Sequence, residues 1–311
     1  MERKKKVLII AGPTASGKTS CAVELAVRLD GEIVSADSMQ LYKYMDIGSA
    51  KPAQEEQARA VHHLVDEIDP RQPFSVAQYR QMAGSRIDGI RERGKVPVVA
   101  GGTGLYIHSI VSNMDFSGRQ PNPARREELH RLAAENGPES LHALLETLDP
   151  EAAARIHPHN LKKMIRAIEA AEKGEKIPSF DHAEEGSSEY DCLMFCLTMD
   201  RQKLYERIDR RVDEMVEQGL FREVRGLMDR GLRTEDISMK GIGYKEIIAC
   251  LEGQYDREEA IRLVKRNTRR YAKRQLTWFR RYQNGIWMDV TEGTGEAIDR
   301  MTELARGFLR E

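Results

Sequence analysis

The sequence has few cysteines and no long apolar run, and these two absences narrow the class of protein. Its cysteines are Cys21, Cys192, Cys196 and Cys250, and none belongs to a Cys-x-x-Cys pair. A disulfide framework and a zinc site are therefore not expected, and buried free thiols in a reducing compartment are. No apolar run approaches the roughly 20 residues that a membrane-spanning helix needs.

We do not expect a targeting signal at the N-terminus. Its basic start, Met1–Lys6, runs straight into the short apolar segment Val7–Ile10, which is too short for a signal peptide. We expect the first strand of a cytoplasmic protein without a membrane partner. The 311 residues contain no repeat or low-complexity tract, and 40% of them are hydrophobic and 32% charged. This composition is typical of a globular chain long enough for two domains.

The net charge of −1 conceals an uneven distribution. Residues 201–282 hold 21 Lys and Arg against 14 Asp and Glu, a balance of +7, whereas residues 120–190 hold 9 against 14, a balance of −5. A basic region in a nearly neutral chain indicates a polyanionic partner that meets one face.

The segment Gly12-Pro13-Thr14-Ala15-Ser16-Gly17-Lys18-Thr19 matches the phosphate-loop pattern G-x-x-x-x-G-K-[ST] in full. It follows an apolar run and opens an amphipathic pattern, which is the strand–turn–helix setting that the pattern requires. The loop amides and the helix N-terminus would bind phosphate oxygens, Lys18 would reach the terminal phosphate, and Thr19 would ligate Mg²⁺. The loop predicts a bound di- or triphosphate but does not say which one.

Two more polar clusters follow apolar segments. Asp37–Gln40 comes after Glu32–Ala36, and Gly101–Gly104 comes after Val96–Ala100. With a helical pattern from Ser75 to about Arg93, this alternation predicts a doubly wound parallel sheet. Because such sheets bind ligands at the carboxyl ends of their strands, the three clusters should converge on one site.

Residues 119–189 interrupt this pattern. They show helical segments without a strand pattern, and strand patterns return at Cys192–Thr198 and Ile286–Val290. We therefore expect a phosphate-loop α/β core made of residues 1–118 and 190–311, with residues 119–189 as an all-helical insertion domain. The predicted helices of the insertion are Arg125–Asn136, Ser140–Leu148, Pro150–Ile156 and Asn160–Lys173.

Residues 258–281 are the most unusual part of the chain, because every charge from Arg262 on is positive. The aromatic residues Tyr271, Trp278 and Phe279 are interleaved with the cations, and we expect no nearby acid to neutralise them. RNA phosphates fit this pattern, although a surface helix paired with acidic segments elsewhere is the plainer alternative. The cations predicted to share one side of a helix are Arg266, Arg269, Arg270, Lys273 and Arg274.

Several of these motifs together resemble the bacterial tRNA dimethylallyltransferases. The resemblance covers nearly the whole chain. It is carried by Gly12–Thr19, Ser35–Gln40 with Tyr42, Met45–Pro52, Gly101–Tyr106, Ala154–Pro158, Gly241–Tyr244 and Ala272–Trp278.

The resemblance implies an enzyme that transfers a dimethylallyl group from its diphosphate to N6 of adenosine 37 in tRNAs that read codons starting with U. It implies that Lys18 and Arg211 hold the diphosphate, that Thr19 helps to hold Mg²⁺, and that Asp37 is the general base. It implies a monomer that binds the anticodon stem-loop. The residues that it places at tRNA are Asp37, Ser38, Met39, Gln40, Thr103, Arg126, Lys162, Lys163, Arg166, Lys240, Gly243, Tyr244, Lys245, Lys273, Arg274, Gln275, Trp278 and Arg280.

The chemistry of this transfer suits the residue types. The exocyclic N6 of adenosine is a poor nucleophile, so a carboxylate that takes its proton as the C–N bond forms is needed. Asp37, at a strand end beside the phosphate loop, would serve both substrates; the alternative role for Asp37 is to organise Mg²⁺. The rival functions are an ATP-dependent small-molecule or nucleoside kinase, an RNA-binding GTPase and a transferase acting on free AMP or ADP. No guanine-binding signal and no strand ending in a Walker-B Asp supports the GTPase.

Overall fold

The structure is a computed structural model that describes residues 4–112, 122–176 and 189–311. The chain divides into two compact units, one made of Met1–Asn113 with Ala183–Glu311, and one made of Met114–His182. The predicted boundary between residues 118 and 119 lies outside the described residues. The predicted boundary between residues 189 and 190 falls at the first residue of strand β5.

The first unit is built on one parallel sheet of six strands, in the order β3-β2-β4-β1-β5-β6. This confirms the predicted doubly wound α/β core. The strands are β1 (Lys5–Ala11), β2 (Gly31–Ser35), β3 (His62–His63), β4 (Val96–Gly101), β5 (Tyr190–Thr198) and β6 (Ile286–Asp289).

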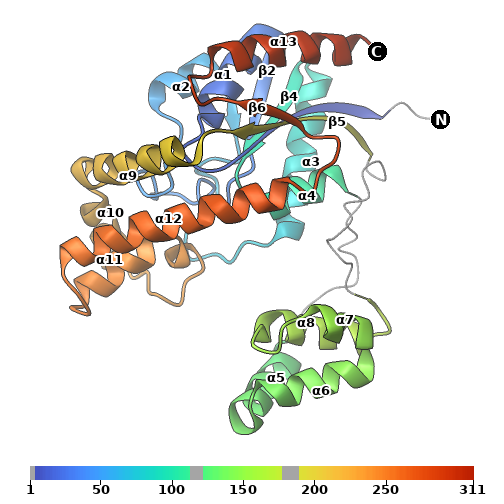
Figure 1. The fold of residues 1–311 in the computed structure, drawn as a ribbon, viewed down its shortest axis with the longest axis vertical. Coiled ribbons are helices and arrows are strands. Elements are labelled where there is room, and N and C mark those ends of the chain that lie inside the picture. The colour runs from blue at the N-terminus through green and yellow to red at the C-terminus, as the bar shows by residue number, and fades with distance from the viewer. Residues whose placement is uncertain (1–3, 113–121, 177–188) are drawn as a thin grey trace. The chain divides into compact units, whose positions relative to one another are not determined.

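Helices cover both faces of the sheet (Figure 1). In β1 successive side chains alternate between the faces. Val7 and Ile9 pack with the helices of one face, and Leu8 and Ile10 pack with those of the other. On the first face lie α3 (Val76–Glu92) and α4 (Gly104–Val111), and on the second lie α1 (Lys18–Leu29), α13 (Gly295–Arg310) and the start of α9 (Arg201–Gln218).

The remaining helices of this unit are α2 (Gln54–Arg59), α10 (Leu220–Asp229), the short 3₁₀ helix η1 (Ser238–Lys240), α11 (Tyr244–Leu251) and α12 (Arg257–Phe279). Helix α12 contains most of the basic segment and packs along α9 and α11 (Figure 1). A separate apolar cluster joins α10 and α11 to the loop after β2 through Tyr42, Met45, Val224 and Ile247.

The second unit consists of helices in its described residues, with no strand among them. They are α5 (Pro123–Asn136), α6 (Pro138–Leu148), α7 (Pro150–Arg155) and α8 (Leu161–Ala171). Their apolar faces form a small core of their own around Leu129, Leu141, Leu145, Met164 and Ile168.

No described helix combines the length and the apolar character that crossing a membrane requires. All four cysteines carry free thiols, and Cys21 and Cys196 are buried as predicted, whereas Cys192 and Cys250 are only partly buried. Burial raises the pKa of Cys21 and of Cys192 to about 12, so neither thiol is activated.

Candidate active site

The phosphate loop has the backbone of an anion-binding turn. Ala15 and Gly17 have φ values of 64° and 89°, and Gly17 is the N-cap of α1. Positive φ values in a short loop turn consecutive N–H groups toward one point, where the dipole of α1 adds to them. The buried Ser16 hydroxyl donates to the Pro13 carbonyl at 2.7 Å, which fixes the shape of the loop.

Lys18 is folded over this loop. Its ammonium group donates to the Pro13 carbonyl at 2.7 Å. Burial lowers the pKa of Lys18 to about 8, the negative charge of Asp37 opposes that shift, and the positive charge of Arg211 adds to it. Burial also lowers the pKa of Arg211, again opposed by Asp37. Two half-buried cations therefore lie in the field of one carboxylate.

Asp37 follows β2 and closes a tight turn. Its Oδ1 accepts the N–H of Met39 at 2.8 Å and the N–H of Gln40 at 3.4 Å. Among the described residues no hydrogen bond reaches Oδ2. One carboxylate oxygen therefore holds the turn, and the other remains available to a substrate.

The glycine cluster after β4 packs directly against this turn. Thr103 Oγ1 accepts the N–H of Ser38 at 3.0 Å. A Cβ atom on Gly101 would lie 2.2 Å from the carbonyl oxygen of Ala36, so only glycine permits this approach. The three polar clusters meet at one cavity, as predicted, which is lined by Lys18, Thr19, Asp37, Gln40 and Gly101 among others.

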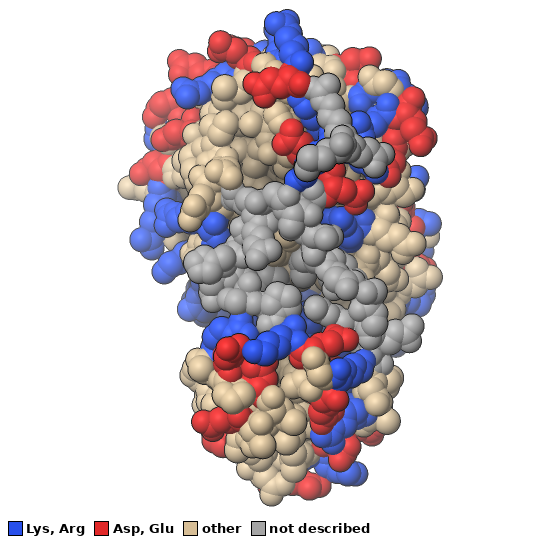
Figure 2. All heavy atoms as spheres, turned by 90° about the vertical axis from the view of Figure 1, so that its right-hand side faces the viewer, with Lys and Arg blue, Asp and Glu red and all other residues tan. Residues whose placement is uncertain are grey.

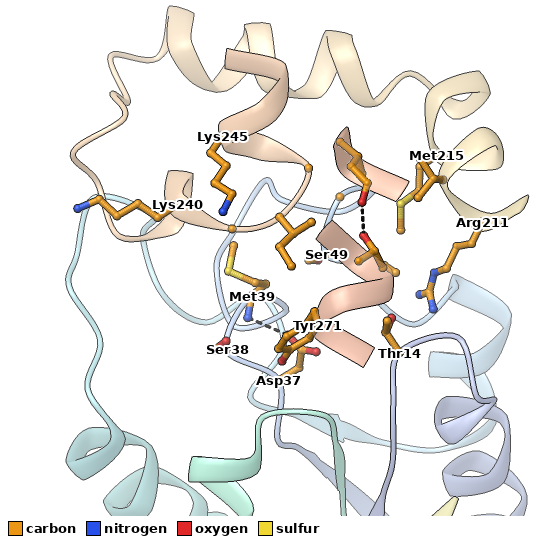
Figure 3. Close-up of a pocket in the computed structure, with 18 of the residues that line it drawn as sticks. Thr14, Asp37, Ser38, Met39, Ser49, Arg211, Met215, Lys240, Lys245 and Tyr271 are labelled. Carbon is orange, nitrogen blue, oxygen red and sulfur yellow. Dashed lines mark hydrogen bonds between the residues drawn. The ribbon is translucent and has the colours of Figure 1, made fainter. Parts of the chain in front are cut away.

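Asp37 lies between this narrow cavity of about 90 Å³ and a wider one of about 440 Å³. The residues common to both linings are Thr14, Asp37, Ser49, Arg211 and Tyr271. In Figure 3 the side chains of Arg211 and Thr14 point toward one another, and Tyr271 lies beside Asp37. The wider cavity is partly apolar, with Met39, Phe74, Tyr106, Val212, Met215 and Val264 in its wall.

Helix α12 connects the phosphate loop to the cluster after β4 through Gln275. The side-chain oxygen of Gln275 accepts the Thr14 N–H at 2.9 Å, and its amide nitrogen donates to the Gly102 carbonyl at 2.9 Å. Gln275 is only 4% exposed. The resemblance places Gln275 at tRNA, whereas both polar groups of its side chain are bonded inside the protein.

Among the cations of α12, two are bonded to acids of another helix and two others are exposed. Contrary to the expectation that no acid neutralises them, Lys265 bonds to Asp213 at 2.6 Å, and Arg269 bonds to Asp209. Both acids are on α9, which packs against this side of α12. Arg270 and Lys273 are exposed, and neither has a charged partner among the described residues. The plainer alternative of internal ion pairs therefore holds for one side of the helix.

Among the other predicted tRNA contacts of the first unit, some are exposed and some are buried. Lys240 and Lys245 are exposed at the rim of the wide cavity (Figure 3). Tyr244 is fully buried and Gly243 is buried, so the Tyr244 side chain does not reach the surface. Trp278 is half-buried against Gly104, whose added Cβ would lie 2.3 Å from the indole, and Arg280 is exposed.

The predicted contacts in the second unit are on two helices. Lys162, Lys163 and Arg166 are exposed on α8, and Arg126 on α5 is bonded to Glu169 at 2.8 Å. On the molecular face drawn in Figure 2, basic and acidic side chains are intermixed.

Two residues in or next to the site belong to none of the sequence motifs. Tyr271 lies on α12 beside Asp37, and burial, with a smaller contribution from Asp37, raises its pKa to about 12. Glu223 on α10 accepts hydrogen bonds from three consecutive backbone amides. Neither belongs to a motif: one is an aromatic residue within a basic run, and the other is one acid among many in a charged segment.

The chain matches two related protein families. The IPP transferase family matches residues 40–282, and the isopentenyl transferase family matches residues 5–69. A tRNA dimethylallyltransferase of Alkaliphilus metalliredigens is 51% identical over 98% of this chain and 99% of that protein. The corresponding protein of Alkaliphilus oremlandii is 53% identical over 99% of this chain and 97% of its own length.

Solved structures agree with these matches. The full-length tRNA isopentenylpyrophosphate transferase of Bacillus halodurans is 44% identical, with a TM-score of 0.75 over 99% of this chain and 97% of that one. A eukaryotic dimethylallyltransferase acting on tRNA is 27% identical, with a TM-score of 0.84 over 98% of this chain and 80% of that one.

Proposed function

The chain belongs to the IPP transferase family, and we propose that it is a tRNA dimethylallyltransferase that modifies N6 of adenosine 37. The observation that carries the proposal is the position of Asp37 between two cavities. Phosphate-loop residues Thr14, Lys18 and Thr19 line the narrow cavity, and the other cavity is wide and partly apolar. Transfer of a group from a diphosphate to a large nucleophile needs one cavity for each substrate, with the base at the point where the two cavities meet.

The residues around the two cavities would have separate roles in the transfer. The allylic C–O bond breaks, and the electron pair leaves with the diphosphate. Backbone amides of the phosphate loop, Lys18 and Arg211 would stabilise the charge that develops there. The new C–N bond forms at N6, and the N6 proton passes to the carboxylate of Asp37. Oδ1 is held by the Met39 and Gln40 amides, so Oδ2 is the acceptor.

The donors around Thr19 suit Mg²⁺. They are oxygen groups, the Thr19 hydroxyl and the Asp37 carboxylate, in the lining that also contains Lys18. No group of three or more His, Cys, Asp or Glu side chains within the described ranges forms a separate metal cage. Mg²⁺ is commonly bound by one or two protein oxygens together with substrate phosphates. When bound, it would neutralise part of the charge on the leaving diphosphate.

The acceptor would be the anticodon stem-loop of tRNA in the cytoplasm. A base stacked in that loop cannot enter a buried cavity, so adenosine 37 would flip out of the stack. The exposed cations near the site would pair with the phosphates around it. Lys240 and Lys245 line the wide cavity, and Arg270 and Lys273 project from α12. The preference for tRNAs that read codons starting with U, and the monomeric state, remain proposals from the resemblance.

The rival kinase function makes a different prediction at the same loop. Incubation of the protein with Mg²⁺, tRNA and either dimethylallyl diphosphate or ATP separates the two. We expect diphosphate release and prenylated tRNA with the first compound and no ADP from the second. Steady ADP formation without prenyl transfer would instead identify a kinase.

A further inference from the structure

The side chain of Glu223 is bonded to two separate segments of the cavity wall. Its Oε2 accepts the backbone N–H groups of Asp46 at 2.8 Å and Ile47 at 2.7 Å. Its Oε1 accepts the Gly48 N–H at 3.0 Å and the Tyr244 hydroxyl at 2.8 Å. Four donors on one carboxylate of a half-buried side chain form a strong junction, because hydrogen bonds to charged groups are the stronger ones.

Tyr244 also packs directly against the loop that contains Gly48. It is fully buried at the start of α11, and a Cβ atom on Gly48 would lie 2.5 Å from its ring. Gly48–Ala50 and Gly241–Gly243 both line the wide cavity. The Glu223–Tyr244 pair therefore joins two parts of the wall of the wide cavity.

A chain of hydrogen bonds continues from this junction to Asp37. The Ala50 N–H donates to the Ile47 carbonyl at 3.0 Å, and the Ala50 carbonyl accepts from the Gln40 side chain at 3.0 Å. The Gln40 side-chain oxygen in turn accepts from the Ser35 hydroxyl at 2.9 Å. The N–H of Gln40 donates to Asp37 Oδ1.

We infer that Glu223 is a positioning residue for prenyl transfer, which sets the orientation of Asp37 through the loop 46–50 and Gln40. The inference rests on the proposed function. Glu223 does not line either cavity of the active site, so it acts without touching a substrate. The carboxylate is required because each of its oxygens accepts two hydrogen bonds.

The substitution Glu223→Gln tests this role. The amide leaves one accepting oxygen, so at least one pair of donors loses its acceptor. Because misplacement of a reacting group by about 1 Å can cost 10²-fold, we expect the single-turnover rate to fall by about 10- to 100-fold. Dissociation constants for tRNA and for dimethylallyl diphosphate should stay at the wild-type values. The matched control is Glu217→Gln, which changes an exposed carboxylate on the neighbouring helix α9.

Hydrogen exchange separates positioning from a loss of folding. In Glu223→Gln the amides of residues 46–48 should exchange faster than in the wild-type protein. The amides of Met39 and Gln40 should also exchange faster, while the amides of the sheet remain protected. Tyr244→Phe removes one of the four bonds with little change of shape, so its rate should fall less.

The outcomes are distinct. Faster exchange at 46–48 with an unchanged transfer rate would overturn the inference, as would an equal rate loss in Glu217→Gln. Absence of prenyl transfer by the wild-type protein would overturn the proposed function instead.

Discussion

The backbone N–H of Thr14 donates a 2.9 Å hydrogen bond to the side chain of Gln275, a residue 261 positions later in the chain. The same side chain donates to the Gly102 carbonyl. The phosphate loop, the strand end after β4 and helix α12 are thus joined at one buried amide. Helix α12 also carries Tyr271 and the exposed cations, so the diphosphate end of the site and its basic surface share one rigid element.

Gln275→Ala should destabilise the protein, because it leaves the Thr14 N–H without a partner and takes the shorter of two hydrogen bonds from the Gly102 carbonyl, which keeps the 3.5 Å bond from the Tyr271 hydroxyl. Removal of one partner of a buried hydrogen bond costs about 1–3 kcal/mol of unfolding free energy. Urea denaturation measures this loss. Gln283→Ala, at an exposed glutamine beyond the same helix, should change the unfolding free energy by less than about 0.5 kcal/mol. Equal stability of both variants would mean that the junction contributes nothing.

Asp37→Asn should separate binding from chemistry. An asparagine keeps an oxygen for the Met39 and Gln40 amides, so the turn survives, but it cannot take the N6 proton. Loss of a positioned base should lower the single-turnover rate by about 10²- to 10⁴-fold, with tRNA affinity little changed. Asp37→Ala should lose a similar factor. If Asp37→Asn retained the wild-type rate and only Asp37→Ala lost it, Asp37 would serve the turn and not the proton transfer.

Removal of the exposed cations of α12 should weaken tRNA binding, whereas removal of the cations bonded to acids should not. Arg270→Ala with Lys273→Ala removes exposed charges and should weaken tRNA binding by roughly 1–3 kcal/mol. For each cation that pairs with a phosphate, its removal should lower the slope of log affinity against log salt by about one. Filter binding across a salt series measures both quantities.

Lys265→Ala with Arg269→Ala is the matched control, because these two side chains are bonded to Asp213 and Asp209. The control should leave the salt slope nearly unchanged. Equal slopes for the two double variants would show that the exposed set does not face RNA.

The affinity for dimethylallyl diphosphate should fall as the pH rises above about 8, the pKa to which burial lowers Lys18. The sign follows from linkage. The protonated ammonium binds the diphosphate, and the bound anion raises the pKa of the ammonium. Affinity is therefore constant below the free pKa and is lost between the free and the bound values. Lys18→Arg keeps its charge and should remove this decline in calorimetric titrations. A decline of the same size in Lys18→Arg would assign it to another group.

The core and the convergence of the site were predictable because both follow from local patterns. A strand, a glycine-rich turn and a helix occur in order at Gly12–Thr19, and the carboxyl ends of parallel strands share one edge. Long-range contacts were not predictable in this way. No spacing rule links Gln275 to Thr14, Arg269 to Asp209, or Glu223 to the amides at 46–48, because each depends on how distant helices pack. Helix α13, which completes one face of the sheet, was also not expected.

The most direct test of the account is nucleoside analysis of a tRNA transcript after incubation with the protein, Mg²⁺ and dimethylallyl diphosphate. The transcript carries adenosine at position 37, and a second transcript carries guanosine there. We predict that digestion yields N6-(dimethylallyl)adenosine from the first transcript, in an amount approaching one per molecule, and none from the second. Unmodified adenosine in the first transcript, or equal modification of both, would contradict the assignment of adenosine 37 as the acceptor.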